Sequence, residues 1–464
     1  MTCNFDAVHS FTIQDIHILL DINSGIVHSL SRMAWDFYQE WEKAGGDAPR
    51  AIEALAKTYD PKELQEIHRQ FESLREEGML FSRDDSLAGY ELPEDTLIKA
   101  LCLHVAHDCN LRCAYCFADT GSFGGKRGLM DADTGKRAID FLFEVSGPRK
   151  HIEVDYFGGE PLLNFAVVRE LIQYGRAKAQ ACGKELKQTL TTNAVLLDAE
   201  KSDFLNAHGV QLILSLDGRP QVHDRMRPAT GGQGSYERVR AGIREYLSRP
   251  NSAGYFIRGT YTRYNPDFCE DVRHLVEQGF LNLSLEPVVA PAGVGYALTE
   301  EDLPQIFEEY EKLAELLYAY GQTGQEVNFF HYNISLDKGP CLPKRLSGCG
   351  AGHEYLAVSP EGDLYPCHQF VGQEEYKIGH VSTGVRNFSI GREFRRAHVF
   401  NKPQCRGCWA RFLCSGGCHA NACSLNRNIL EPYRIGCAIQ QKRLECALYL
   451  QVRKMAGEQD NPAI

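Results

Sequence analysis

Three cysteines within eight residues constrain this chain more than any other feature. The stretch CNLRCAYC places Cys109, Cys113 and Cys116 in one loop, which follows the apolar run 97–107. Structural zinc takes four protein ligands, and no further cysteine or histidine follows within the loop. A [4Fe–4S] cluster held by three thiolates would leave one iron open to a small molecule. Zinc and an unrelated trio of thiols remain alternatives at this point.

The other cysteines and the N-terminus indicate a reducing compartment. The chain has 17 cysteines, and MTCNFDAVHSF has neither the basic start nor the apolar core of a signal peptide. We therefore expect a cytoplasmic protein whose cysteines are ligands rather than disulfides. No apolar run predicts a membrane span, and a net charge of −11 without a basic tract argues against a nucleic-acid partner. Six cysteines outside any ligand spacing are expected to be small buried residues: Cys3, Cys102, Cys182, Cys269, Cys423 and Cys446.

The first region, residues 1–90, predicts a small module of strands and helices. Apolar and polar residues alternate over residues 16–31 on both sides of Asn23, Ser24 and Gly25, which is typical of a hairpin. Helical periodicity follows over 33–46, 49–59 and 61–78, with proline or glycine at the boundaries. The stretch MLFS (79–82) is a further strand candidate. Together these elements predict a winged-helix-like unit, which an acidic linker ends.

The second region, residues 95–300, alternates strands with amphipathic stretches. This order implies an α/β fold with a parallel sheet, either an open doubly wound sheet or a partial barrel. The strand candidates are 97–107, 151–159, 186–193, 210–218, 255–262 and 281–287. Polar or glycine-rich residues follow every one of these strands. We therefore expect a single ligand-binding rim at their carboxyl ends.

The cysteine loop matches C-x3-C-x-aromatic-C, with Tyr115 as the aromatic residue, and in this it resembles the radical S-adenosylmethionine (SAM) enzymes. In that family the open iron binds the amino and carboxylate groups of SAM. The reduced cluster then cleaves SAM to methionine and a 5′-deoxyadenosyl radical. The resemblance implies a partial (β/α)6 barrel for the second region.

The same resemblance assigns SAM-binding roles at the strand ends. Glu160 of the GGEP motif would accept the methionine ammonium, and Arg258 would pair with the methionine carboxylate. Tyr115 would lie near the adenine. Taken singly, each motif has an ordinary structural reading, such as a plain turn for GGEP. The implied set is Tyr115, Gly158, Gly159, Glu160, Pro161, Thr192, Asn193, Ser215, Asp217 and Arg258.

A bridging helix (within 301–340) leads to a cysteine-rich third region, residues 341–450. We expect this region to be organised by metal rather than by a large apolar core. Its pattern is Cys349-x12-Gly362-x4-Cys367, then Cys405-x2-Cys408-x5-Cys414-x3-Cys418, and finally Cys437. A zinc ribbon could use the four cysteines between 405 and 418, but it would leave the other three without a role.

This pattern resembles the seven-cysteine SPASM domain, which carries two auxiliary [4Fe–4S] clusters. By that resemblance Cys405, Cys408, Cys414 and Cys437 hold a distal cluster. A proximal cluster takes Cys349, Cys367 and Cys418, with Cys341 as a candidate fourth ligand. If Cys341 does not bind, an iron of the proximal cluster is open to a substrate thiolate. The implied cofactors are three [4Fe–4S] clusters and SAM.

Several long stretches are similar to the thioether-forming maturases of the ranthipeptide class, the six-cysteines-in-forty-five type. They include AHDCNLRCAYCFADTG, FGGEPLLNF and DGRPQVHDRMRP. The resemblance implies cross-links from cysteine sulfur to a carbon of an acceptor such as Thr, Asp or Glu. Its partners would be a leader-bearing, cysteine-rich precursor peptide and a low-potential donor such as flavodoxin or ferredoxin. The first region resembles a leader-recognition element, which binds peptide by strand addition; an inert or dimerising domain is the alternative.

Anaerobic sulfatase maturases, which form formylglycine, are the main alternative. They usually lack a leader module, and they carry an Asp proposed as general base after the cysteine of the G-x4-C element. Here that position is His368. Histidine could act as the catalytic base, pack beside the cluster, or donate a hydrogen bond to sulfur.

Overall fold

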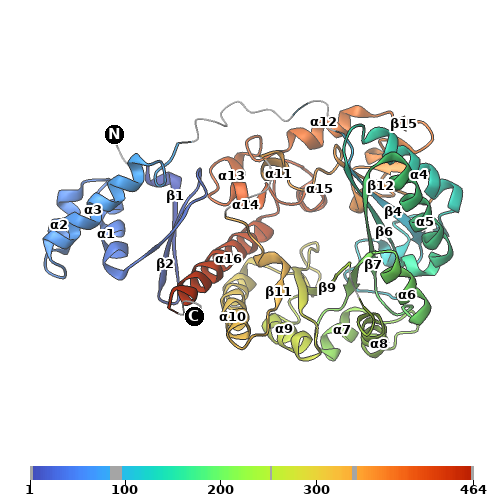
Figure 1. Cartoon of the computed structure of the whole chain (residues 1–464), viewed down its shortest axis with the longest axis horizontal. Coiled ribbons are helices and arrows are strands. Elements are labelled where there is room, and N and C mark those ends of the chain that lie inside the picture. Colours follow the sequence, from blue (N-terminus) through green and yellow to red (C-terminus); the bar gives the residue numbers. More distant parts are fainter. Residues whose placement is uncertain (1–3, 84–92, 94–96, 251–252, 337–341, 461–464) are drawn as a thin grey trace.

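A large sheet forms the centre of the computed structural model, which describes residues 4–83, 93, 97–250, 253–336 and 342–460 (Figure 1). Six of its strands pair in parallel and follow one another in chain order. They are β4 (Ala100–His107), β6 (His151–Gly158), β7 (Glu185–Thr192), β8 (Gln211–Ser215), β9 (Tyr255–Tyr261) and β10 (Asn282–Pro287). The short β5 (Gly128–Leu129) pairs antiparallel with β4. All six predicted strands are thus confirmed. Among the described residues β10 and β4 do not pair, so the sheet is open.

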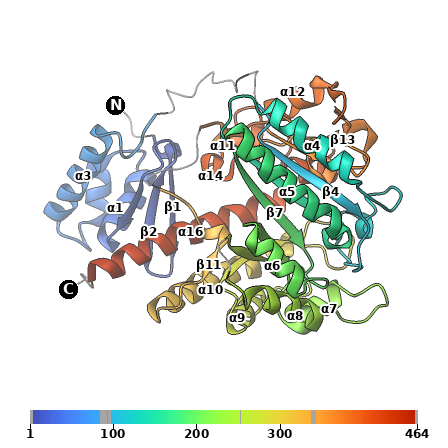
Figure 2. The same ribbon diagram turned by 45° about the vertical axis from the view of Figure 1, so that its right-hand side comes forward.

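Helices cover the outer side of this sheet, as Figures 1 and 2 show. They are α4 (Ala132–Val145), α5 (Phe165–Cys182), α6 (Ala199–Ala207), α7 (Pro220–Met226), α8 (Tyr236–Leu247) and α9 (Phe268–Glu277). Asp131 and Asp198 each accept a hydrogen bond from a backbone N–H at the start of α4 and α6. Strand and helix therefore alternate as the amphipathic stretches predict.

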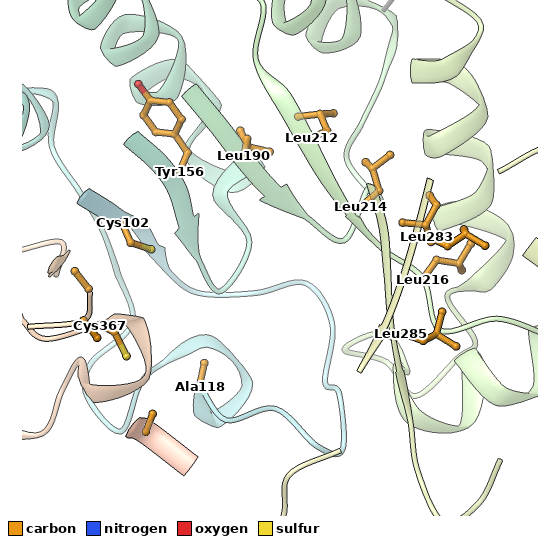
Figure 3. Packing of buried hydrophobic residues seen from close by; sticks show 14 of the residues in the cluster. Cys102, Ala118, Tyr156, Leu190, Leu212, Leu214, Leu216, Leu283, Leu285 and Cys367 are labelled. Carbon is orange, nitrogen blue, oxygen red and sulfur yellow. The ribbon is translucent and has the colours of Figure 1, made fainter. Parts of the chain in front are cut away.

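Leucines on one face of the central strands form much of the core (Figure 3). Leu212 and Leu214 of β8 and Leu283 and Leu285 of β10 are completely buried. Because side chains alternate along a strand, the residues between these leucines face the other side of the sheet. Figure 3 also places Cys367 of the third region near Cys102 of β4.

The third region joins the sheet instead of forming a separate metal-organised lobe. Strand β12 (Tyr355–Val358) pairs in parallel with β4, and Leu356, Ala357 and Val358 are completely buried. The expectation of a region without a substantial apolar core was wrong here, because these apolar residues extend the sheet. Its remaining elements are α11 (Leu342–Ser347), β13 (Asp363–Tyr365), β14 (Gly379–His380), β15 (Gly384–Val385), α12 (Phe388–Arg396), α13 (Pro403–Arg406), α14 (Arg411–Cys414) and α15 (His419–Asn426).

Two long helices connect the parts of the molecule. Helix α10 (Leu303–Gln322) matches the predicted bridging helix, and β11 (Asn328–Phe329) then pairs with β10. Helix α16 (Arg434–Asp460), which the sequence analysis did not identify, lies beside α10 and against the N-terminal sheet (Figure 2). Arg443 of α16 lies 3.3 Å from Glu286 at the end of β10.

The N-terminal unit is a three-stranded antiparallel sheet with three helices. Its hairpin consists of β2 (Ile16–Asp21) and β3 (Val27–Leu30), as predicted. The helices α1 (Arg32–Lys43), α2 (Ala48–Leu55) and α3 (Pro61–Glu76) also match. The first strand, β1 (Val8–Ile13), was missed, because it reaches β2 through Gln14 at φ 53° without a glycine or asparagine signal. Residues 79–82 are not a strand; Leu80 and Phe81 are buried in the core of the unit.

The N-terminal sheet packs on the rest of the same chain. Phe11, Ile13, Ile18 and Leu20 belong to the main apolar core. On β1, His9 stacks on Trp409 with ring centroids 3.8 Å apart, and its Nε2 lies 3.0 Å from Glu445 of α16. The unit is therefore held by apolar burial and by contacts close to the cysteine-rich region. No helix among the described residues is long and apolar enough to cross a bilayer.

Replacing Leu214 by alanine is expected to destabilise the fold by roughly 2–5 kcal/mol, because it leaves a cavity in a completely buried position. Unfolding of the cluster-free protein by denaturant, followed by circular dichroism, measures the change. Leu163→Ala is the control, since Leu163 is 37% exposed, and it should cost much less. Equal losses would contradict the core described here.

Candidate active site

A cavity of about 480 Å³ lies at the carboxyl ends of the six parallel strands. Residues in or just after the carboxyl-terminal half of each of the six strands contribute to its wall, so the strand ends share one rim, as predicted. From the predicted set, the wall includes Cys109, Cys113, Tyr115, Cys116, Gly158, Gly159, Thr192, Asn193, Ser215, Arg258, His368 and Cys418. Glu160, Pro161 and Asp217 are buried outside this wall.

Backbone contacts fix the cysteine loop at the end of β4. The N–H groups of Arg112 and Ala114 donate to the carbonyls of Pro228 and Met226. Burial raises the pKa of Cys109 to about 12 and that of Cys113 to about 11. All three cysteines of the loop line the same cavity.

The GGEP turn lies directly against this loop. The N–H of Gly159 donates to the carbonyl of Ala106 at 2.8 Å, and the N–H of Glu160 donates to that of Asp108 at 2.8 Å. Gly158 has a φ of +133°, and a Cβ there would lie 2.2 Å from the Ala106 oxygen. Both glycines are therefore needed for the approach of two backbones.

Glu160 organises the turn from behind the cavity wall. Its carboxylate accepts hydrogen bonds from the Thr192 hydroxyl at 2.7 Å, the Asn193 N–H at 2.8 Å and the Leu162 N–H at 2.9 Å. Burial raises the pKa of Glu160 to about 7, and the hydrogen bonds oppose this shift. In this structure the carboxylate thus holds the ends of β6 and β7 together. Asn193 in turn donates to Asn110 in the cysteine loop at 2.7 Å.

A buried ion pair supports the cysteine loop from the other side. Arg227 donates through Nε to Asp217 at 3.0 Å, and the Tyr115 hydroxyl donates to the same carboxylate at 2.5 Å. The Arg227 guanidinium also lies 5.3 Å from the Tyr115 ring centroid and lowers the pKa of Cys113 against the effect of burial. Sequence reasoning missed Arg227, because one arginine in the arginine-rich stretch DGRPQVHDRMRP carries no distinctive spacing.

The opposite wall comes from the third region. His368 contacts Phe157 and Phe117, and its Nδ1 lies 3.1 Å from the Tyr355 hydroxyl. Burial and the positive charge of Arg258 lower the pKa of His368 to about 4, so its imidazole is neutral at physiological pH and weakly basic. Helix α15 adds further lining side chains that the sequence analysis did not single out, Asn421 and Ser424.

The cysteines of the third region form two groups. Cys437 is influenced electrostatically by Cys414, Cys405 and Cys408, and burial raises its pKa to about 12. Separately, the thiols that influence Cys367 are those of Cys418 and Cys349. These thiols belong to the distal and proximal ligand sets that the SPASM resemblance implies, and their binding of clusters stays a prediction. Cys341 lies outside the described residues.

The thiol groups fit iron–sulfur clusters by donor type and by hydrogen bonding. Gln441 of α16 donates to Cys408 Sγ at 3.3 Å, and the Leu111 N–H donates to Cys109 Sγ at 3.4 Å; such bonds stabilise ligating thiolates. Among the described residues no three His, Cys, Asp or Glu side chains converge as a single ion requires. A [4Fe–4S] cluster instead takes one thiolate on each of several irons of a cube.

The cysteines without predicted ligand roles differ among themselves. Cys102, Cys269 and Cys446 are buried, as expected. Cys182, at the C-terminus of α5, is exposed, so that expectation was wrong. Cys423 is half-buried and hydrogen-bonds with Tyr376. Cys3 lies outside the described residues.

Two family matches cover the regions that hold these groups. Residues 100–239 match a 4Fe-4S single cluster domain, and residues 349–409 match SPASM, an iron-sulfur cluster-binding domain. The chain is 24% identical over 332 residues to a cysteine-type anaerobic sulfatase-maturating enzyme of Clostridium perfringens, covering 67% of this chain and 85% of that protein. It is 27% identical over 337 residues to the mycofactocin maturase MftC of Mycolicibacterium smegmatis, covering 69% and 78%.

Solved structures share the fold. Native anSMEcpe with bound AdoMet aligns with a TM-score of 0.64 at 20% identity, covering 77% of this chain and 99% of that chain. Streptococcus suis SuiB bound to S-adenosylmethionine aligns with a TM-score of 0.53 at 16% identity, covering 94% and 99%. The two matched domains and the SAM-bound structures with the same fold support [4Fe–4S] clusters and SAM as cofactors.

Cys418 and Cys423 provide a matched test of the proximal ligand set. Cys418→Ala should lower the iron content of the reconstituted protein by about one third, because one of three four-iron clusters loses a ligand. Cys423→Ala should leave the iron content unchanged. Iron and sulfide analysis after anaerobic reconstitution gives both values, and an equal loss in the two variants would contradict the grouping.

Arg227→Met is expected to destabilise the protein by roughly 3–5 kcal/mol, because it leaves the completely buried Asp217 without its cation. Adding Asp217→Asn should recover part of this loss. Denaturant unfolding of the cluster-free variants measures both effects. Arg225→Met, at an exposed site two residues away, is the control and should change stability little.

Proposed function

We propose that this chain is a radical SAM maturase that joins cysteine sulfurs to carbons in a ribosomally made, cysteine-rich peptide. One observation carries the proposal. The cavity that contains the three-cysteine loop is also lined by Cys418, a member of the proximal auxiliary set. A substrate in this space would contact both groups at once. We also propose that the residues of the predicted SAM-binding set, from Tyr115 to Arg258, bind SAM.

The chain's own residues supply the positions for such a reaction. SAM bound at the three-cysteine cluster supplies a 5′-deoxyadenosyl radical for hydrogen abstraction. Forming a C–S bond removes one hydrogen from the acceptor carbon and one from the thiol, a net loss of two electrons. One electron leaves with the abstracted hydrogen, so the second needs an acceptor near the substrate. Through Cys418, which lines the cavity wall, the proximal cluster would be an acceptor close to the substrate.

Apolar and uncharged polar side chains of the cavity wall together suit a peptide side chain. Phe117 and Phe157 are apolar, whereas Gln369, Asn421 and Ser424 are polar and uncharged. Arg258 is exposed to the cavity. His331, Arg443 and Arg258 together lower the pKa of the half-buried Glu286 carboxyl, although burial opposes this. We propose that Arg258 pairs with the SAM carboxylate, and that the polar side chains of α15 bind the peptide backbone.

The N-terminal unit supports a leader-bearing substrate. Within the described residues, β3 pairs with β2 alone, so its other edge is open to strand addition. SuiB, whose structure has also been solved bound to precursor peptide SuiA, covers 91% of this chain in that complex. We propose that residues 1–90 form a winged-helix-like leader-binding domain.

A sulfatase maturase is the second candidate, and a specific similarity favours it. A cysteine-type sulfatase-maturating enzyme is among the relatives, and anSMEcpe has the higher TM-score of the two structures described above. Against it stand His368, where that group has aspartate, and the N-terminal unit. The pKa of His368, about 4, also makes it a weak general base.

Mass spectrometry separates the two functions. The protein is reconstituted anaerobically, reduced with dithionite and incubated with SAM and the cysteine-rich peptide encoded nearest to its gene. Loss of two hydrogens per cross-link, with no free thiol at the modified cysteine, is the expected result. Conversion of a thiol to an aldehyde in a sulfatase motif would support the second candidate, and no 5′-deoxyadenosine at all would overturn both.

The leader test uses the same full-length enzyme. A synthetic leader without core residues should compete with the precursor and lower the rate of cross-linking, because both need the β3 edge. A scrambled leader of equal composition is the control. Equal processing of precursors with and without leader would contradict the role proposed for the N-terminal unit.

A further inference from the structure

Lys402 is a lysine whose side chain has no access to solvent. Its exposed fraction is 0%, whereas lysines are almost never fully buried without a partner. Its carbonyl accepts the N–H of Cys405 at 2.9 Å, at the N-terminus of α13. The residue is therefore fixed next to the first ligand of the distal set.

The ammonium group of Lys402 contacts the loop that joins the two auxiliary sets in the sequence. Its Nζ donates to the carbonyl of Gly416 at 2.7 Å. Gly416 stands two residues after Cys414 of the distal set and two before Cys418 of the proximal set. It has a φ of +85°, and a Cβ there would lie 3.5 Å from Nζ, so the loop passes closely over the ammonium.

The charge of Lys402 also interacts with thiols of both auxiliary sets. Burial lowers the pKa of Lys402, and the nearby thiols oppose this shift. Those thiols come from both sets: Cys405, Cys414, Cys418 and Cys437. In the part of the chain that the structure describes, the polar contact of the Lys402 ammonium is the Gly416 carbonyl, and no carboxylate pairs with it. One carbonyl offsets only part of the cost of burying an ammonium. Anionic iron–sulfur clusters nearby would offset the rest.

We propose that Lys402 supplies the positive charge shared by the two auxiliary clusters and thereby raises their reduction potentials. Each cluster gains one negative charge when it is reduced, so a nearby cation stabilises the reduced form more than the oxidised one. This inference rests on the auxiliary clusters and is independent of the peptide reaction. Within the proposed function, it makes these clusters better acceptors for the electron that remains after C–S bond formation.

The test measures midpoint potentials instead of turnover. The full chain carries Cys109→Ala, Cys113→Ala and Cys116→Ala, so that only the auxiliary clusters contribute to the electron paramagnetic resonance signal. Lys402→Met removes the charge at similar volume, and Lys402→Arg keeps it. Lys344→Met, at an exposed lysine of α11, is the control. No peptide or SAM is needed, so failure of the peptide reaction does not affect the result.

Lys402→Met should lower the reduced-to-oxidised ratio of the auxiliary clusters at least tenfold at a fixed potential, which is 59 mV for a one-electron couple. Lys402→Arg and Lys344→Met should stay close to the parent protein. Loss of auxiliary iron in Lys402→Met, with retention in Lys402→Arg, would also support the proposal, since only charge distinguishes the outcomes. Unchanged potentials in Lys402→Met, or loss of iron in both Lys402 variants, would overturn it.

Discussion

The close approach of two backbones at the ends of β4 and β6 is the constraint on which the rest of the site depends. Two hydrogen bonds of 2.8 Å join the GGEP turn to residues 106 and 108, directly before the first cysteine of the loop. A Cβ at Gly158 or Gly159 would collide with the backbone carbonyl of Ala106 or Asp108. Glu160 then fixes β7 to the same turn. The position of the cysteine loop relative to three strands follows from these few bonds.

Much of the fold could be predicted from the sequence, because its strands and helices have strong local signals. Six buried strands with polar ends, three helices after a hairpin and one long amphipathic helix are confirmed. The missed elements have weak signals. Strand β1 ends in a turn at Gln14, which has no glycine or asparagine signal. Helix α16 contacts several elements, so its apolar residues do not form one stripe along the helix. Strand β12 was missed because three apolar residues among cysteines and glycines show no clear period.

The supporting residues of the site could not be predicted from the sequence. The two auxiliary ligand sets came from the resemblance to the SPASM domain, and their binding of clusters stays a prediction. In contrast, Arg227 and Lys402 are recognisable only once burial is known, because an arginine or lysine in a polar stretch is ordinarily exposed. Glu160 shows the reverse case, since its motif suggested contact with ligand whereas its oxygens bind the chain itself.

Helix α16 contacts both the proposed peptide-binding sheet and the rim of the cavity. Glu445 pairs with His9 of β1, Arg443 pairs with Glu286 at the end of β10, and Gln441 binds Cys408. These three residues lie within two turns of one rigid helix. A ligand at the rim that displaces this helix changes the affinity of the N-terminal sheet for a peptide by some factor. Thermodynamic reciprocity then requires an occupant of the sheet to alter affinity at the rim by that same factor.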